Sequence, residues 1–339
     1  MKSLRARPGL VTWVVLVLLM ASIPTWGLTR YYYGLFDQAM IFAIAVMGLY
    51  FVLGLTGQLS LAQAAFFGLG AYVSAIMTTR WGLPLWVNLP VSVAAAAVMG
   101  VLLGIPSLKL SGHYLAMTTI GFGVILALVF RNWRPVTGGA DGIGGIKPTH
   151  LLGVSLAQND TFFYVVLLCL VLATVVALRV SRSRLGRAFQ AIRENQLAAE
   201  CTGIDSTRFK VIAFTICAAY GGLAGSLWTH WTRYISPDTF EFDTSVKMLA
   251  MLVVGGSTGI AGSLIGAGLL TLLPEALRFL HSSYLAVYGA AIIVLMIFMP
   301  EGIWGMAVYL VKRRTAGAVE TPRMLGQSEG PTTDGTAVG

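Results

Sequence analysis

The uncharged polar residues Thr56, Gln58, Ser60 and Gln63 lie close together in a stretch that otherwise consists of apolar residues and glycine. Polar side chains mixed with glycines inside a membrane domain can line a path for a polar solute. These four residues are therefore the candidate lining of a translocation path. The alternative is that the same hydroxyl and amide groups join helices by hydrogen bonds and carry no solute.

Sequence patterns for other chemistries are missing or incomplete. The glycine-rich stretch 255–259 resembles a phosphate-binding loop but lacks the lysine that contacts phosphate, so we expect no ATP binding by this chain. Ser226 lies near His230, as in an intramembrane hydrolase, but no nucleophile-elbow motif accompanies them. The histidines and cysteines have no metal-binding spacing; they are His113, His150, His230, His281, Cys169, Cys201 and Cys217. We therefore predict no catalytic residues, no metal and no cofactor on this chain.

Ionisable residues inside the apolar stretches are few. Asp37, Lys247 and Glu275 are the candidates, and all three lie near the expected outer ends of spans, where water lowers the cost of a charge. Proton-coupled carriers use a buried series of carboxylates, which this sequence lacks. The energy for any transport is therefore expected to come from another protein.

The composition is that of an integral membrane protein. Apolar residues make up 56% of the 339 residues and charged residues 11%, against roughly 25% charged in soluble domains. Stretches that approach the roughly 20 apolar residues needed for a crossing recur along the whole chain. We predict an all-α, polytopic transmembrane domain over residues 1–310, with about ten transmembrane helices. The predicted spans are 10–28, 35–55, 61–77, 85–105, 114–130, 162–180, 211–231, 246–258, 260–280 and 284–299.

Residues 244–280 are too many for one crossing, since a continuous helix of that length would run roughly 55 Å. Gly255, Gly256 and Gly259 supply a break. We favour two short crossings, because they return the C-terminus to the cytoplasm. A re-entrant hairpin is the alternative, and it would place the basic C-terminal end outside.

The formal net charge of +9 indicates membrane orientation rather than a nucleic-acid partner. With a cytoplasmic N-terminus, most lysines and arginines fall on the inner side, which is the positive-inside pattern. Both termini are therefore predicted to be cytoplasmic. A cleaved signal peptide is the alternative for 10–28, but Ser22, Ile23 and Pro24 form a poor cleavage site.

Two further segments lie outside the predicted spans. The periplasmic loop 132–160 is rich in glycine, which allows tight reversals, and it is either a flexible connection or a docking surface for an external protein. Its candidate docking residues are Gly138, Gly139, Asp141 and Gly142. The cytoplasmic tail 315–339 has too few apolar residues to offset the entropy of ordering and is predicted to be disordered.

The cytoplasmic loop 181–210 is polar and basic, yet apolar residues recur in it at helical spacing. Gly203 fits a helix C-cap, and Asp205 or Ser206 can cap the helix that follows. The apolar strip is narrow and alanine-rich, which favours a helix held in a cleft of another protein over an amphipathic helix resting on lipid. The residues predicted to couple this loop to the protein that holds it are Arg187, Phe189, Ile192, Arg193, Glu194, Ala199, Glu200 and Gly203.

Six short motifs are spread along the chain. They are GLTGQLSLAQAAFFGLGAY at 54–72, YLAMTTIGF at 114–122, TGGADGI at 137–143, GRAFQAIRE at 186–194, SPDTF at 236–240 and MPEG at 299–302. Together, and in this order, they resemble the permeases of branched-chain amino acid ABC importers, in the LIV-type M subunit family. One small departure is Ala62 before Gln63, where relatives often carry Gly-His or Gly-Gln.

The resemblance implies a multi-pass permease subunit of a bacterial inner (plasma) membrane, surrounded by membrane lipid. Its implied partners are a homologous second permease (H-type), two cytoplasmic ATPase subunits that bind ATP and Mg²⁺, and a periplasmic substrate-binding protein. Residues 198–203 would belong to the loop that couples the permease to the ATPases. The implied cargo is a branched-chain or related hydrophobic amino acid, and urea, short amides and aromatic acids are alternatives within the family. An ATP-independent channel or facilitator is the remote alternative.

Overall fold

The protein is almost entirely helical, as the sequence predicts. The computed structural model describes residues 30–107, 112–147, 150–151, 154–155, 159–278, 284–298, 302–306 and 308. Within these ranges the named strands are two short ones, β1 (His150–Leu151) and β2 (Val154–Ser155), which pair antiparallel. The predicted first span 10–28 and the tail 315–339 lie outside the described residues.

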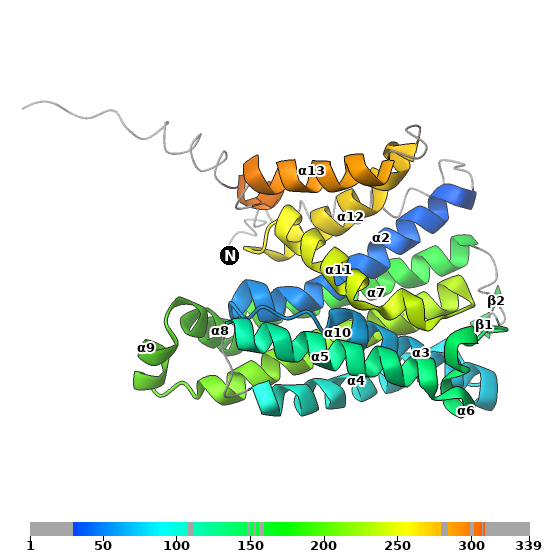
Figure 1. Ribbon diagram of the computed structural model, residues 1–339, viewed down its shortest axis with the longest axis horizontal. Helices are drawn as coiled ribbons and strands as arrows, with labels where there is room; N and C mark the ends of the chain where they lie inside the picture. The colour runs from blue at the N-terminus through cyan, green and yellow to red at the C-terminus, as the bar shows by residue number, and fades with distance from the viewer. Residues whose placement is uncertain are drawn as a thin grey trace, which may run out of the picture.

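The described helices pack side by side into one bundle (Figure 1). The long elements are α2 (Arg30–Leu49), α3 (Gln63–Trp81), α4 (Leu85–Ser107), α5 (His113–Asn132), α7 (Asn159–Arg182), α8 (Arg184–Glu194), α10 (Ser206–Thr232), α11 (Phe242–Gly255), α12 (Ile260–Ala276) and α13 (Tyr284–Phe298). The short elements are the π-helix η2 (Tyr50–Leu55), the 3₁₀ turns η3 (Gly139–Asp141) and η4 (Pro237–Phe240), and the helices α6 (Arg134–Thr137) and α9 (Gln196–Cys201).

Helix α2 forms the centre of the bundle. Its apolar window is 89% buried, against 28% for α5, so α2 is surrounded by other helices whereas α5 lies at the edge. The α2 sequence is apolar on all sides, with Met40, Ile41, Ile44 and Met47 fully buried, which is the pattern of a helix enclosed on every face.

Glycines bring α3 and α10 into backbone contact. A Cβ atom added at Gly70 would lie 2.3 Å from the carbonyl oxygen of Gly222, and one added at Gly225 would lie 1.9 Å from that of Phe67. Such small residues drive helix association in membranes, because lipid leaves no hydrophobic gain for packing apolar faces together. The α3–α10 pair therefore depends on close approach of the two backbones.

The described helices support several membrane crossings. Five helices are long and apolar enough to cross, namely those at Tyr31–Leu55, Leu85–Ile105, His113–Asn132, Thr161–Arg182 and Ser206–Thr232. A sixth candidate is the pair Phe242–Gly255 and Ile260–Ala276, which is bent by 119° at its break. The protein is thus a polytopic helical membrane protein, whereas ten crossings stay a prediction.

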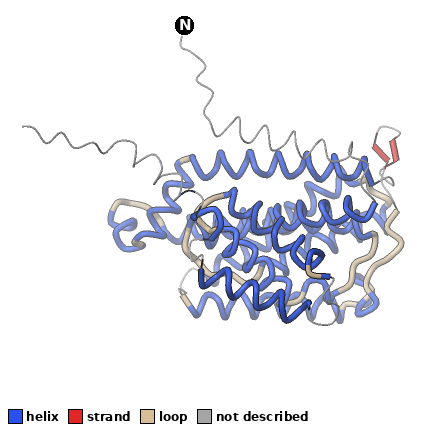
Figure 2. Tube along the Cα trace, turned by 90° about the horizontal axis from the view of Figure 1, so that it is seen from above, coloured by secondary structure: helices blue, strands red, loops and turns tan. Residues whose placement is uncertain are grey.

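The two connections singled out in the sequence lie at opposite ends of the bundle. Helices α8 and α9 extend beyond one end, and α6 with the β1–β2 pair lies at the other end (Figures 1 and 2). We refer to these as the α8–α9 end and the α6 end. A protein that contacts one of these connections is therefore on the opposite side of the bundle from a protein that contacts the other.

Candidate functional site

The crossing that follows α2 is helical over only part of its length. The first described span, α2 with η2, runs from Tyr31 to Leu55 without a gap; residues 56–62 are then non-helical, and α3 begins at Gln63. We refer to residues 56–62 as the break. Gln63 Nε2 donates to the carbonyl of Ala45, ten residues before Leu55, so the chain returns roughly 15 Å into the bundle before α3 starts. Non-helical backbone at membrane depth occurs only where protein buries it or where it lines a cavity, and broken helices of this kind form the solute sites of many transporters.

Side chains from two other helices hold the break in place. The backbone N–H of Leu61 donates to Thr119 Oγ1 of α5 over 3.1 Å, and the N–H of Ala64 donates to Ser245 Oγ of α11 over 2.9 Å. These bonds supply the partners that a regular helix would supply from its own backbone. Movement of α5 or α11 would therefore change the position of the break.

Three of the four predicted path residues are buried. Thr56 and Ser60 are each 1% exposed and Gln63 is 0% exposed. Thr56 Oγ1 donates to the carbonyl of Val52 over 2.6 Å, so its hydroxyl closes the end of η2. Gln58 is half-buried, and its Oε1 accepts no hydrogen bond from the residues that the structure describes. Of the four, Gln58 is thus the one with a free polar atom.

Replacing Gln63 with leucine is expected to destabilise the fold. Gln63 donates to Ala45 and accepts from Cys217 Sγ over 2.9 Å, and both bonds are buried. Leucine has a similar size but can form neither bond, which should lower the free energy of unfolding by about 1–3 kcal/mol. Thermal unfolding of the purified subunit in detergent measures this change. The exposed Gln190→Leu is the matched control, and equal stability of the two variants would contradict the structural role of Gln63.

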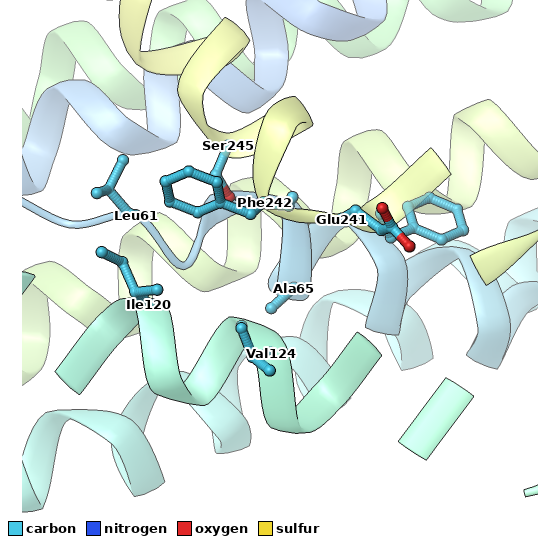
Figure 3. A pocket seen from close by; sticks show the side chains of 10 residues that line it. Leu61, Ala65, Ile120, Val124, Glu241, Phe242 and Ser245 are labelled. Atoms are coloured by element: carbon cyan, nitrogen blue, oxygen red, sulfur yellow. Dashed lines mark hydrogen bonds between the residues drawn. The ribbon is translucent and has the colours of Figure 1, made fainter. Parts of the chain in front are cut away.

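A hollow lies beside the break (Figure 3). It is partly open to the exterior and has space for about one water molecule. Its lining comes from the start of α3, the middle of α5, and η4 with the start of α11: Leu61, Ala64, Ala65, Ile120, Gly123, Val124, Phe240, Glu241, Phe242 and Ser245. Most of the lining side chains are apolar, but the surface that the hollow exposes is as polar as it is apolar.

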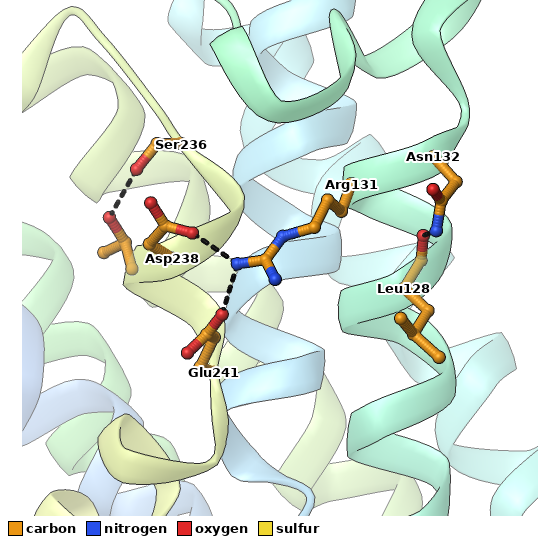
Figure 4. A network of polar contacts seen from close by, with 7 residues as sticks. Leu128, Arg131, Asn132, Ser236, Asp238 and Glu241 are labelled. Carbon is orange, nitrogen blue, oxygen red and sulfur yellow. Dashed lines mark hydrogen bonds and ion pairs between the residues drawn. The ribbon is translucent and has the colours of Figure 1, made fainter.

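Arg131 joins two of the elements that line this hollow. Its Nη2 lies 2.6 Å from Asp238 Oδ1 of η4 and 2.6 Å from Glu241 Oε1 (Figure 4). All three side chains are largely exposed, so each ion pair contributes only about 0–1 kcal/mol to stability. The pairing therefore sets the orientation of the Glu241 carboxylate more than it stabilises the fold.

The predicted coupling loop is a pair of helices, α8 and α9. Ser183 caps α8 by accepting from the N–H of Leu185, and Asn195 caps α9 by accepting from that of Ala198. Gly203 has φ +87°, which confirms the predicted glycine C-cap. Asp205 accepts a hydrogen bond from the backbone N–H of Arg208 and so caps α10. Of the two predicted caps, Asp205 and Ser206, it is therefore Asp205 that caps the helix.

The apolar strip of this loop faces its own chain. Phe189 is 0% exposed and packs edge-to-face on Phe209 of α10, and Ile192 is 4% exposed. Ala199 is also buried. The structure differs here from the expectation that this strip enters a cleft of another protein, because the strip is already covered by the membrane domain.

Glu200 connects α9 to the first turn of α10. The Ser206 hydroxyl and the Gln196 amide both donate to its carboxylate, and they hold the pKa of Glu200 below its usual value. Lys210 Nζ donates to Gln196 Oε1 over 2.9 Å and completes the network. The α9 helix is thus joined to the membrane domain through its own acidic residue.

The outward surface of α8 and α9 is polar, with one large apolar side chain. The exposed residues are Arg184, Arg187, Gln190, Arg193, Glu194, Asn195, Leu197, Ala198, Glu200 and Cys201. Leu197 is 74% exposed. Leu197 is not among the residues predicted from the sequence, because it lies off the apolar strip. A large apolar residue isolated among polar residues and alanines is the signal that could have identified it as a contact residue.

The predicted docking loop is folded against the end of α10 rather than free. Gly138, Gly139 and Gly142 have φ values of +79°, +69° and +71°, which glycine adopts most readily. A Cβ at Gly142 would lie 2.0 Å from the carbonyl oxygen of Ile235, and Tyr234 donates to the carbonyl of Asp141 over 2.9 Å. Close backbone contacts and this hydrogen bond thus hold residues 138–142 against the chain that follows α10.

Ser226 and His230 form part of a buried hydrogen-bond chain. Ser226 Oγ lies 3.0 Å from Ser74 Oγ, which lies 3.2 Å from His230 Nε2. All three are buried between α3 and α10, so the hydrogen bonds join these two helices. Among the described residues, no group of three or more His, Cys, Asp or Glu side chains could hold a metal ion.

These features define the class of the protein. A bundle of apolar helices with a broken span at its centre, a hollow beside the break and a folded two-helix loop at one end is the architecture of a membrane transport protein.

Comparison with known proteins assigns the family. Residues 31–300 match the family described as "Branched-chain amino acid transport system / permease component", and the chain belongs to this family. It is 34% identical to the high-affinity branched-chain amino acid transport system permease protein LivM of Salmonella typhimurium over 304 residues, which are 83% of this chain and 72% of that protein. The resemblance drawn from the six sequence motifs is therefore confirmed.

More distant relatives include two other permeases. The chain is 25% identical over 288 residues to LivH of Escherichia coli, another branched-chain amino acid transport system permease protein, covering 78% of this chain and 91% of that one. It is 24% identical over 281 residues to the ribose import permease protein RbsC of Haemophilus influenzae, covering 79% of this chain and 84% of that protein. No solved structure gives a significant match. The protein is thus a membrane permease component.

Proposed function

We propose that this permease carries branched-chain amino acids inward across a bacterial inner membrane, driven by two separate ATPase subunits. A periplasmic binding protein delivers the solute at the α6 end, and ATP and Mg²⁺ bind to the ATPases alone. The observation that carries the proposal is the broken span at 56–62, held between α5 and α11, in a chain 34% identical to LivM.

The cargo is proposed from the relatives, since the chain is 34% identical to LivM and 24% identical to the ribose import permease RbsC. The hollow beside the break is consistent with an aliphatic solute in one respect, because Leu61, Ile120 and Val124 on its lining offer apolar contacts.

A second, homologous permease is proposed to cover the exposed face of α5. This helix is the least buried of the five long spans, and the hollow lies against it. Tyr114, Met117, Ile125 and Leu128 are each more than half exposed on it. A partner on this face would place the hollow between the two permeases, so that movement of one against the other opens it.

The α11–α12 hairpin supports two short crossings and a cytoplasmic C-terminus. A Cβ at Gly54 would lie 2.6 Å from the carbonyl oxygen of Ser257, so the tip of the hairpin reaches the α8–α9 end. The far end of α12 lies at the opposite side, where Tyr31 donates to Glu275. With the N-terminus also cytoplasmic, this arrangement fits the ten crossings of a domain over 1–310.

The function is tested by uptake into proteoliposomes. The chain is co-expressed with the proposed partners, a second permease, two ATPases and a binding protein, and the purified assembly is reconstituted. We expect uptake of labelled leucine that requires ATP and binding protein, and competition by isoleucine and valine but not by ribose or urea. Leucine uptake without ATP would indicate a facilitator and would overturn the proposal.

The orientation is tested with a native cysteine. Cys201 is exposed in α9, whereas Cys169 is half-buried and Cys217 is buried. A maleimide that cannot cross membranes is expected to label the chain in inverted vesicles and not in intact spheroplasts. Cys201→Ser should abolish this labelling, and labelling of intact spheroplasts at Cys201 would contradict a cytoplasmic α8–α9 end.

A further inference from the structure

Arg193 differs from the other arginines of the α8–α9 loop in the direction of its side chain. Its Nη1 donates a half-buried hydrogen bond to the carbonyl of Gly54, at the end of η2. Arg187, on the same helix, donates instead to the carbonyl of Arg182 within the loop itself. Arg193 thus connects α8 to the turn from which the broken segment starts.

The carbonyl of Gly54 has no hydrogen-bond donor within its own helix. The last carbonyls of a helix have no intrahelical partner, and a cation near them is favourable because they carry the negative end of the helix dipole. The carbonyls of Val52 and Leu53 accept from backbone N–H groups of the following turn. The carbonyl of Gly54 accepts from Arg193.

Three elements meet at this bond. Gly57 has φ +70°, and a Cβ there would lie 3.2 Å from Arg193 Cγ, so the turn packs directly under the arginine stem. A Cβ at Gly54 would lie 2.6 Å from the carbonyl oxygen of Ser257, at the tip between α11 and α12. The end of α8, the start of the broken segment and the hairpin tip are therefore in contact around one turn of chain.

We propose that Arg193 is the positioning residue that carries movement of the α8–α9 loop to the broken segment 56–62 and to the hairpin tip. This rests on the proposed function. The arginine holds the carbonyl of Gly54, so a displacement of α8 changes where 56–62 lies against α5 and α11. The π-helical winding of η2 suits this role, since such windings are frequent at functional sites and at helix kinks.

The test compares Arg193→Gln with Arg208→Gln in the reconstituted complex. Arg208 is an exposed arginine of the same loop, paired locally with Asp205, so its loss removes an equal charge without touching the turn. The readout is the leucine taken up per ATP hydrolysed. We expect Arg193→Gln to lower this ratio by roughly tenfold or more, Arg208→Gln to leave it unchanged, and Arg193→Lys, which keeps one donor, to recover part of it.

An unchanged ratio in Arg193→Gln overturns the inference while leaving the proposed function in place. A wild-type complex without ATP-dependent uptake overturns both. If Arg193→Gln fails to assemble, hydrogen exchange in the wild-type complex decides. The amides of 56–60 are expected to change their exchange rates when a non-hydrolysable ATP analogue binds, and equal rates with and without the analogue overturn the inference.

Discussion

Replacing Gly225 with alanine is expected to remove most of the folded protein from the membrane. The added Cβ would lie 1.9 Å from the Phe67 carbonyl oxygen and 2.7 Å from the Ala71 backbone nitrogen. Both neighbours are helix backbone, which cannot rotate away as a side chain would. The two helices must separate, which would also stretch the Thr229 Oγ1 bond to the carbonyl of Ala71, 3.0 Å long. We expect a loss of about 3 kcal/mol, the upper part of the range for overpacking.

The control for this prediction is Gly268→Ala in α12. No heavy atom lies within 4 Å of a Cβ added there, and the residue is inside a helix, so alanine should be neutral or slightly stabilising. Membrane abundance and the unfolding temperature in detergent are measured for both variants. Equal abundance and equal unfolding temperature of Gly225→Ala and Gly268→Ala would mean that the α3–α10 contact is not what holds the bundle together.

Replacing Leu197 with alanine is expected to weaken binding of the proposed ATPase subunits. Leu197 is 74% exposed at the start of α9, surrounded by charged and polar residues of the α8–α9 surface. A large apolar side chain in such a position has the character of an interface anchor, whose loss costs about 2 kcal/mol or more. That corresponds to roughly 30-fold weaker binding. Co-purification of the ATPases with the tagged permease, followed by titration of the purified subunits, measures the effect.

Leu168→Ala is the matched control for this experiment. Leu168 is 54% exposed on α7, within the membrane bundle and away from the loop, so ATPase binding should stay at the wild-type level. If Leu197→Ala binds ATPases as tightly as Leu168→Ala does, the docking surface must lie elsewhere on α8 and α9.

The coupling loop illustrates what helical spacing can and cannot predict. The spacing of Phe189, Ile192 and Ala199 predicted one short helix that ends at Gly203. The structure has two helices, α8 and α9, because Asn195 is extended and its side chain caps α9. The spacing did not predict what the apolar strip packs against. Phe189 packs on Phe209 of the next helix, a contact that depends on how α8 folds back. The strip therefore faces inward, and Leu197 faces outward.

The candidate translocation path likewise shows that a sequence pattern does not predict which residues a side chain contacts. The cluster around 56–63 was visible from its polar residues and glycines, and the structure places it at a break in a span. Gln63 nevertheless bonds to Ala45 and Cys217, which are distant in sequence, so its amide joins helices. The hollow is lined instead by residues such as Ile120 and Phe242, whose apolar side chains are indistinguishable in the sequence from those that face lipid.

The sequence by itself determined the helical membrane class, the family, the position of the polar loops and the glycine at the end of α9. Apolar length, charge asymmetry and motif order are all properties that can be read along the chain. Only the tertiary structure decided which side of each helix is covered, that Arg193 reaches Gly54, and that Gly225 meets Phe67. In a chain this apolar the inward and outward faces of a helix have nearly the same composition, because lipid and protein interior are equally apolar.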